Sequence, residues 1–395
     1  MRSFSVISLS IGLVLLLTQG GFAVDPSKHE EPLSPSDSNM IEQLLSLADD
    51  PNPYARIEAI ERLHLWRQDP RAAAALKTAV HDEIWLVRRT ALGLGHGTLG
   101  DSIEPLADKQ VDAASQIVLL KQGNEPERIS AALRLAWADQ PEAVDALIRA
   151  LKHKESIVRS AAADALGADP LNASRATETV LNALKEGAAD SDRWVREKSL
   201  NGVGRFLFGD YKARTIEFLG KAAQNENDSS VRVAAVHSLR SAQTKRSSEI
   251  LIPFLNDAAP EVRAEAAGGV HLECFPRGSA PLIKALYDPD PSVRREAAFS
   301  LGQAQDRKAL QPLVDALVDS DEAVRLAAAQ SLGDLKDPEA IPQMEKIAEQ
   351  DPSEEVRRAI RRSVRSIEND GTSLLASRLF KFISKWKPLP GHCRG

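Results

Sequence analysis

The sequence has few residues that could cross-link or stiffen a fold. It contains 2 cysteines, and aromatic residues make up only 5% of its 395 residues. A disulfide scaffold is therefore excluded, and the core must be filled mainly by Leu, Val, Ile and Ala, which suit packed helices. Cys274 and Cys393 fall in different parts of the chain, and we expect both to stay free and non-catalytic.

The sequence also lacks a large excess of charge of either sign. Its 50 Lys and Arg against 56 Asp and Glu give a net charge of −6. This balance argues against nucleic-acid phosphates as the main partner. With 43% apolar and 27% charged residues, the composition is that of a globular protein.

The apolar run near the N-terminus, Val6–Leu17, is shorter than the roughly 20 residues that a membrane span needs. Arg2 precedes it, and the small residues Gly21 and Ala23 that follow suit signal-peptide cleavage. We predict a signal peptide over residues 1–23 and an exported protein, periplasmic or extracellular. An uncleaved membrane anchor is the alternative.

A short motif recurs along residues 40–370 at intervals of about 31 residues. Two clear copies are Ser-Val-Arg-Arg-Glu-Ala-Ala-Phe-Ser-Leu-Gly from Ser292 and Ala-Val-Arg-Leu-Ala-Ala-Ala-Gln-Ser-Leu-Gly from Ala323. The residue that all copies share is an arginine, namely Arg56, Arg88, Arg128, Arg159, Arg196, Arg232, Arg263, Arg294, Arg325 and Arg357. Residues 24–39, rich in Pro and Ser, are predicted to form a flexible linker before the repeats.

Each repeat predicts two helices. A second apolar pattern with helical spacing lies between motifs, as at Leu310, Leu313, Val314, Leu317 and Val318. The turn before the motif offers an N-cap residue followed by proline, as in Asp290-Pro291. A helix pair cannot cover its own apolar face, so we predict an all-α superhelix, a solenoid of about ten two-helix repeats in one elongated domain.

The pattern Asp-x-Asp-x-x-Val-Arg-x-x-Ala-Ala-x-x-Leu-Gly at this spacing resembles the short HEAT repeat of the phycobilin-lyase-like type, from about Met40 to Ile367. The resemblance implies a solenoid but no particular function, because such repeats serve many partners. In that family the motif arginine pairs with a turn aspartate, and Asp228, Asp290 and Asp321 stand at matching places. We expect a structural ladder of arginines; the alternative is a row of anion sites for a polyanionic glycan.

Enzymes that resemble this repeat type use residues that this chain lacks. Deoxyhypusine hydroxylases hold two irons on His-Glu pairs, whereas the one His-Glu dipeptide here, His29-Glu30, lies in the linker. Phycobilin lyases work as paired subunits inside photosynthetic cells, which fits poorly with a signal peptide. The Gly-x-Gly-x-x-Gly stretch at residues 95–100 follows a helix and not a strand, so we interpret it as a helix stop. We predict no catalytic residue, no metal and no cofactor.

Two tryptophans are candidates for binding a partner. Trp85 and Trp194 fall at the start of motif helices, where a side chain tends to be exposed, and aromatic anchors are typical interface hot spots. The alternative is that each packs over its neighbour's loop. Trp66 and Trp137 lie among apolar residues and are predicted to be core.

The C-terminal part is basic, since five arginines lie between Arg357 and Arg365. Residues 371–395 predict a basic amphipathic helix and tail. Its candidate surface-anchoring residues are Arg378, Lys381, Phe382, Lys385 and Trp386. This helix could lie on an anionic membrane or wall polymer, or dock on an acidic partner. The simpler alternative is a cap that covers the last repeat.

The function predicted from these features is an exported, non-enzymatic scaffold that binds a protein or peptide on the concave face of the solenoid. The acidic central repeats favour a partner of basic or mixed charge. The alternatives are an enzyme or enzyme subunit of the lyase-like or hydroxylase-like kind, and a surface-associated protein held by its basic C-terminal helix.

Overall fold

The computed structural model describes residues 35–91, 112–138, 140–168, 177–303 and 306–384. These residues form helices and connecting turns with no strand, so the predicted all-α fold is confirmed. The chain divides into two compact units, unit 1 (residues 1–175) and unit 2 (residues 176–395). Within the described ranges, no helix is both long and apolar enough to cross a membrane.

Unit 1 consists of paired short helices. Its elements are α2 (Pro35–Ala48), α3 (Pro53–Leu63), η1 (His64–Trp66), α4 (Pro70–Ala79), α5 (Trp85–Ala91), α6 (Ala113–Gln122), α7 (Glu125–Leu135), α8 (Pro141–Ala150) and α9 (Ser156–Gly167). The motif helices pack in sequence order, α3 on α5 and α7 on α9, while α2, α6 and α8 cover them. Helix α2 begins inside the predicted linker, and its first residue, Pro35, suits the first turn of a helix.

Unit 2 repeats the same plan over a longer stretch. Its elements are α10 (Glu178–Gly187), α11 (Arg193–Gly204), η2 (Gly209–Tyr211), α12 (Lys212–Asn225), α13 (Ser229–Ser241), α14 (Lys245–Leu251), η3 (Ile252–Asn256), α15 (Pro260–Gly269), η4 (Pro276–Gly278), α16 (Ser279–Ala285), α17 (Pro291–Gln303), η5 (Arg307–Ala309), α18 (Leu310–Ala316), α19 (Glu322–Leu335), η6 (Pro338–Ala340), α20 (Ile341–Gln350) and α21 (Glu354–Ser384).

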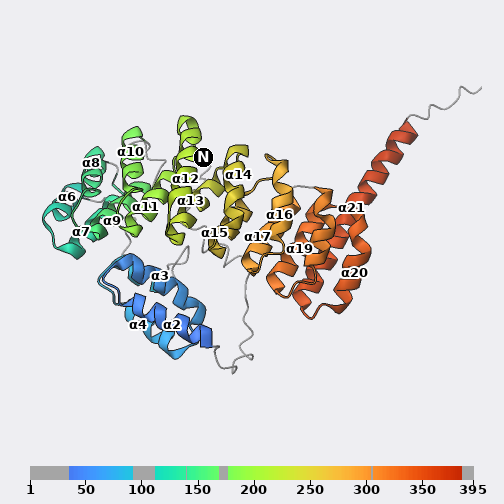
Figure 1. Ribbon diagram of the computed structural model, residues 1–395, viewed down its shortest axis with the longest axis horizontal. Helices are drawn as coiled ribbons and strands as arrows, with labels where there is room; N and C mark the ends of the chain where they lie inside the picture. The colour runs from blue at the N-terminus through green and yellow to red at the C-terminus, as the bar shows by residue number, and fades with distance from the viewer. Residues whose placement is uncertain (1–34, 92–111, 139, 169–176, 304–305, 385–395) are drawn as a thin grey trace, which may run out of the picture. The chain divides into compact units, whose positions relative to one another are not determined.

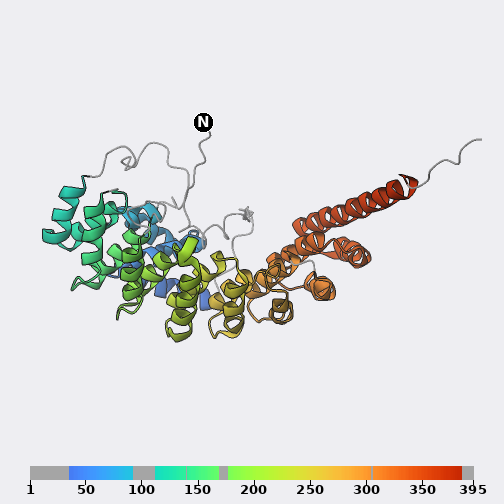
Figure 2. The same ribbon diagram turned by 90° about the horizontal axis from the view of Figure 1, so that it is seen from above.

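The helices of unit 2 form two layers (Figures 1 and 2). The motif helices α11, α13, α15, α17, α19 and α21 make the second-helix layer, in which each helix packs on the next. The even-numbered helices α10 to α20 make the first-helix layer, and each packs on its own motif helix. Stacking is therefore between nearest neighbours, as in other repeat proteins.

Small residues bring neighbouring motif helices close together. On α17, Val293, Ala297 and Leu301 are fully buried. A Cβ built on Gly302 would lie only 2.5 Å from the Cβ of Ser331 on α19, so a larger residue cannot fit without a shift. The buried hydroxyl of Ser331 donates to the carbonyl oxygen of Ala298 at 2.9 Å, which adds a polar link across the same seam.

Three sequence predictions need correction, two about tryptophans and one about the C-terminal helix. Trp137, predicted to be core, is 64% exposed because it follows the end of α7, and Trp66 is only half-buried. Helix α21 runs without a break from Glu354 to Ser384, so the basic C-terminal segment continues the last motif helix and does not begin a new one at residue 371.

Candidate protein-binding site

The motif arginines of unit 2 connect each repeat to the next. In α15, Arg263 donates from Nη1 to the carbonyl oxygens of Asp257 and Ala258 in its own turn, at 2.9 and 3.2 Å. Its Nε and Nη2 donate to the two carboxylate oxygens of Asp288 in the next turn, both at 2.8 Å. The guanidinium thus hydrogen-bonds the backbone of its own turn and forms a bidentate ion pair with the following turn.

The same arrangement recurs along the chain. Bidentate pairs to the next turn are Arg56–Asp82, Arg196–Glu226, Arg232–Asp257, Arg294–Asp319 and Arg325–Asp351. Arg128 reaches Glu155 through Nη1 alone. Arg88, Arg159 and Arg357 keep the bonds to the carbonyls of their own turns.

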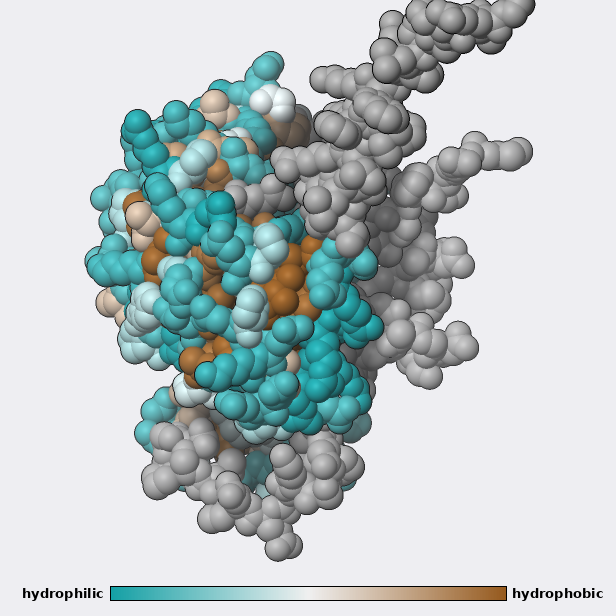
Figure 3. Space-filling view, turned by 90° about the vertical axis from the view of Figure 1, so that its right-hand side faces the viewer, coloured by the Kyte–Doolittle hydropathy of each residue, from teal (hydrophilic) through white to brown (hydrophobic). Residues whose placement is uncertain are grey.

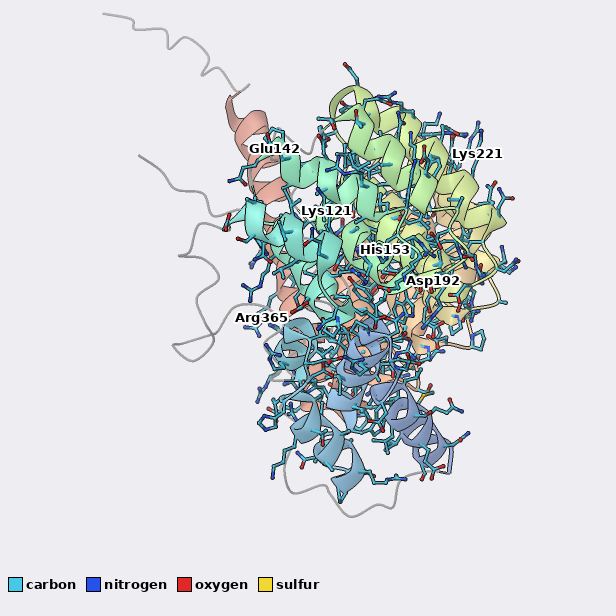
Figure 4. All side chains as sticks on the ribbon, turned by 90° about the vertical axis from the view of Figure 1, so that its left-hand side faces the viewer. Lys121, Glu142, His153, Asp192, Lys221 and Arg365 are labelled. Carbon is cyan, nitrogen blue, oxygen red and sulfur yellow. The ribbon has the colours of Figure 1, made fainter. Side chains whose placement is uncertain are left out.

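The predicted aspartate partners were wrong by two residues. Asp290 does not bind a motif arginine; its Oδ1 accepts the backbone N–H of Ser292 at 2.8 Å and caps α17, and Asp228 and Asp321 cap their helices likewise. Asp192 caps α11 in the same way (Figure 4). The arginine partner is the earlier acid of each turn, such as Asp288, which belongs to the following repeat.

Three carboxylates of the ladder, those of Asp257, Asp288 and Asp319, have lowered pKa values and are held ionised. Burial, the largest single influence on the pKa of Asp288, raises it, but hydrogen bonds from Arg263 and from the backbone N–H of Asp290 outweigh burial and leave the pKa below its usual value. The pKa values of Asp257 and Asp319 are lowered for the same reasons. Because the bidentate arginines already hold carboxylates, their geometry favours a structural role over binding of a polyanion.

Of the two tryptophan candidates, the structure describes the side chain of Trp194. The side chain of Trp194 is buried, with 7% exposed, and the guanidinium of Arg193 lies 4.1 Å from its ring centroid. Trp194 therefore follows the alternative in which it packs against its neighbours. Trp85 is the first residue of α5, and its side chain lies outside the described part of the structure.

A cluster of buried charges lies on three successive motif helices. On α13, His237 Nδ1 lies 3.1 Å from Glu265 Oε2 of α15, and Arg240 Nη1 lies 3.6 Å from the same oxygen. Arg240 Nη2 lies 3.0 Å from Glu296 Oε2 of α17, two repeats along the chain. Arg240 can span α15 because Gly268 has no side chain; a Cβ there would collide with both Arg240 and Glu296.

The two carboxylates of this charge cluster are almost fully buried. The side chains of Glu265 and Glu296 are 7% and 6% exposed, whereas His237 and Arg240 are 25% and 20% exposed. Burial is the largest single influence on the pKa of Glu265 and raises it. The hydrogen bond with His237 and the charges of His237 and Arg240 together lower the pKa by more than burial raises it, so the net shift is downward.

An exposed aromatic side chain lies beside the charge cluster on α17. Phe299 is 40% exposed, and Arg295, also on α17, donates from Nη2 to Glu296 Oε1 at 3.2 Å. We call the charge cluster together with Arg295 and Phe299 the second-helix site. The sequence signal that could have found it is a departure from the motif, since Glu265 and Glu296 stand two residues after the motif arginine, where four of the other repeats carry Ala.

The last motif helix carries exposed cations. Arg358, Arg361, Arg362 and Arg365 are exposed on α21 and, with Glu355, line a shallow groove of about 500 Å³. Figure 3 views this end of unit 2, where hydrophilic residues cover most of the surface around smaller areas of hydrophobic ones. The predicted anchoring side chains lie outside the described part: these are Arg378, Lys381, Phe382, Lys385 and Trp386.

The described residues hold no group of three or more His, Cys, Asp or Glu side chains arranged to bind a metal ion. The thiol of Cys274 is exposed and unbridged, and Cys393 lies outside the described residues.

Comparison with known families agrees with this architecture. The HEAT-repeat family matches residues 117–204, 181–270 and 279–365, which together make up more than half of the chain. The chain is a HEAT-repeat protein. The sequence-based recognition of HEAT repeats is thereby confirmed, and the two layers of unit 2 are the two helices of each HEAT repeat.

Solved HEAT-repeat structures resemble this chain at low sequence identity. YibA from Escherichia coli is 21% identical over 68% of this chain and 99% of its own, with a TM-score of 0.51. The CpcE–CpcF complex of phycocyanin lyase from Nostoc is 20% identical over 69% of this chain and 100% of its own, with a TM-score of 0.36. Importin beta is 13% identical over 83% of this chain and 55% of its own, with a TM-score of 0.46. No curated protein matches the sequence. At these identities the likeness shows the fold alone.

Proposed function

We propose that this HEAT-repeat protein is an exported, non-enzymatic scaffold that binds a protein or peptide at the second-helix site of unit 2. The observation that carries the proposal is the combination of a buried charge cluster with the exposed ring of Phe299 on adjoining motif helices. A rigid, partly desolvated charge set beside an aromatic anchor is the composition of an interface hot spot.

The partner that fits this site presents an apolar residue and a basic one. Phe299 offers apolar area, while Glu296 Oε2 is buried and, despite its ion pair with Arg240, accepts no well-aligned hydrogen bond. That oxygen is closed to a partner, so the contact offered to a partner is an apolar side chain covering the Phe299 ring, while the excess of acidic residues in residues 24–356 attracts a basic segment. We therefore propose a partner segment of basic or mixed charge.

Paired alanine variants of the full chain test this function. Partner protein captured from the exported fraction by the wild type is identified, purified and titrated against Phe299→Ala, which should weaken binding about tenfold or more. Tyr287→Ala is the matched control, because Tyr287 is an exposed aromatic residue (66%) that follows α16 of the first-helix layer. Equal affinity of the two variants would reject the second-helix site.

Export is part of the proposal and rests on residues 1–23 of the sequence. The basic residue, short apolar run and small residues in this order support a signal peptide. Fractionation of the cells of origin, with N-terminal sequencing of the recovered protein, should find the mature chain outside the cytoplasm and shortened at about residue 24. A full-length cytoplasmic protein would reject export while leaving the binding site to be judged by the variants above.

A surface-associated role is the second candidate, supported by the exposed arginines of α21. It predicts that the protein sediments with the envelope and is released by high salt, because interactions of exposed charges are screened. An enzymatic role, the remaining alternative, predicts stoichiometric iron or a bound chromophore in the purified protein, which elemental analysis and absorption spectroscopy would detect.

A further inference from the structure

Within the described residues, Arg357 is the last arginine of the ladder, and it makes half of the contacts that Arg263 or Arg294 makes. In α21, Arg357 Nη1 donates to the carbonyl oxygens of Asp351 and Pro352, at 2.6 and 3.1 Å, as the other motif arginines except Arg128 do in their own turns. In α19, Arg325 also forms an ion pair with Asp351 of the next turn. No carboxylate of the described residues takes that place for Arg357, because no described repeat follows it.

The guanidinium of Arg357 is therefore oriented for a carboxylate that the described structure does not supply. The two carbonyls fix its plane, and the Nε–Nη2 edge is the edge that binds both oxygens of Asp288 in the case of Arg263 and of Asp319 in the case of Arg294. A pre-oriented guanidinium loses less conformational freedom on binding than a mobile one.

The arginines beside this edge prevent a further repeat from stacking. Arg361 stands four residues after the motif arginine, where α17 has Ala298, the acceptor of the Ser331 hydroxyl. Arg365 stands eight residues after it, where α17 has Gly302, whose missing side chain admits Ser331. Two long, charged side chains thus replace the small residues that close helix approach requires.

The same arginines attract an acidic ligand that needs no helix seam. Arg358, Arg361, Arg362 and Arg365 line the groove of α21 together with Glu355, and Arg357 lies outside this lining. Arg358 also pairs with Glu354, so the four arginines outnumber the two acids beside them. A polypeptide turn that carries a carboxylate could reach Arg357 along the ladder edge without covering that seam. The local field also favours its approach.

We propose that Arg357 and the groove of α21 bind an acidic Asp-x-Asp segment of a partner polypeptide, with its first aspartate in the place that Asp288 or Asp319 takes in the inner repeats. This site is separate from the second-helix site and goes beyond the proposed scaffold function. The first aspartate of the segment is the one expected to bind Arg357, because in the inner repeats the earlier acid of each turn binds the arginine and the later acid caps a helix.

The test titrates the full chain with three blocked peptides of residues 286–293 of this sequence: the unaltered peptide, one with Asp288→Asn and one with Asp290→Asn. The two altered peptides have equal charge, so general attraction to the groove cannot separate them. We expect Asp288→Asn to weaken binding about tenfold and Asp290→Asn to have less than about a threefold effect. Equal affinity of the two altered peptides would overturn the proposal, and this comparison does not depend on any protein variant folding.

Two protein variants test whether Arg357 is the residue that distinguishes the altered peptides. Arg357→Gln should remove the preference between the two altered peptides, whereas Arg67→Gln, an exposed arginine of unit 1 with the same change of charge, should keep it. Sedimentation of the wild type that shows Arg357-dependent self-association would assign the site to a second copy of this chain. Binding to anionic phosphatidylglycerol vesicles without peptide binding would assign it to a membrane. Either result would overturn the proposal.

Discussion

The link between α17 and α19 through Arg294 and Asp319 offers the sharpest test of how the repeats are held together. Nε and Nη2 of Arg294 each donate to Asp319 at 2.7 Å, and Nη1 donates to the carbonyl oxygens of Asp288 and Pro289 at 2.9 and 3.0 Å. Both side chains of the pair are 12% exposed. Solvent therefore screens this pair only weakly.

The magnitude follows from burial and geometry. Arg294→Met removes four donor contacts and leaves a nearly buried carboxylate without its partner, so the free energy of unfolding should fall by about 3 kcal/mol. Asp319→Asn preserves the shape and should cost about 2 kcal/mol, because the arginine keeps its carbonyl partners. If the pair itself carries most of the effect, the coupling energy of the double variant should be about 2 kcal/mol.

Urea denaturation of the wild type, both single variants and the double variant measures this coupling. The matched control is Arg246–Glu217, a bidentate pair between α14 and α12 whose side chains are 56% and 45% exposed. Its coupling should be clearly smaller, since exposed pairs are screened and ordered at an entropic cost. A ladder coupling no larger than that of the control would refute the view that the arginines lock the repeats together.

Three further outcomes follow from the described contacts. Gly302→Ala should destabilise the protein by about 1–2 kcal/mol, because the new Cβ would collide with Ser331, even though alanine has the better helix propensity. The control Gln303→Ala, on the exposed side of α17, should be near neutral when both variants are compared by thermal unfolding. His237→Ala should lower the free energy of unfolding at neutral pH by about 1–2 kcal/mol, because it leaves the buried carboxylate of Glu265 with one partner fewer. The same variant should raise the pKa of Glu265, which an NMR titration would measure. The carboxylates of Asp257, Asp288 and Asp319 have folded-state pKa values below 3.8, the usual value for aspartate. The stability that they contribute is therefore present above pH 3.8 and is lost as the pH falls through the folded-state values. The free energy of unfolding, measured against pH in acid, should show this loss, and a flat profile below about pH 4 would contradict it.

The repeated helix pairs could be predicted because local signals agree in the clearest copies, such as the one on α17. The N-cap residue of the turn, the buried Val293 and Ala297, and the terminal Leu-Gly each specify the same helix. The ladder itself was predicted in kind but assigned to Asp290 and not to Asp288. Both acids stand in the same turn, and only the geometry shows that the later one is committed to capping.

The second-helix site could not be predicted from one repeat at a time. His237, Arg240, Glu265 and Glu296 come from three repeats, and each alone is an ordinary substitution in a helix. Their meeting depends on the absence of a side chain at Gly268, which has no local sequence signal. Trp137 was misplaced for a related reason, because an apolar neighbourhood in the sequence does not show that a residue lies beyond the end of its helix.

Hydrogen exchange of the full chain, alone and with its captured partner, tests the central claim most directly. The account predicts slower exchange in α13, α15 and α17 when the partner binds, with little change in the neighbouring first helices α12, α14 and α16. Protection confined to the first-helix layer, or no change in unit 2, would contradict a binding site built on the motif helices.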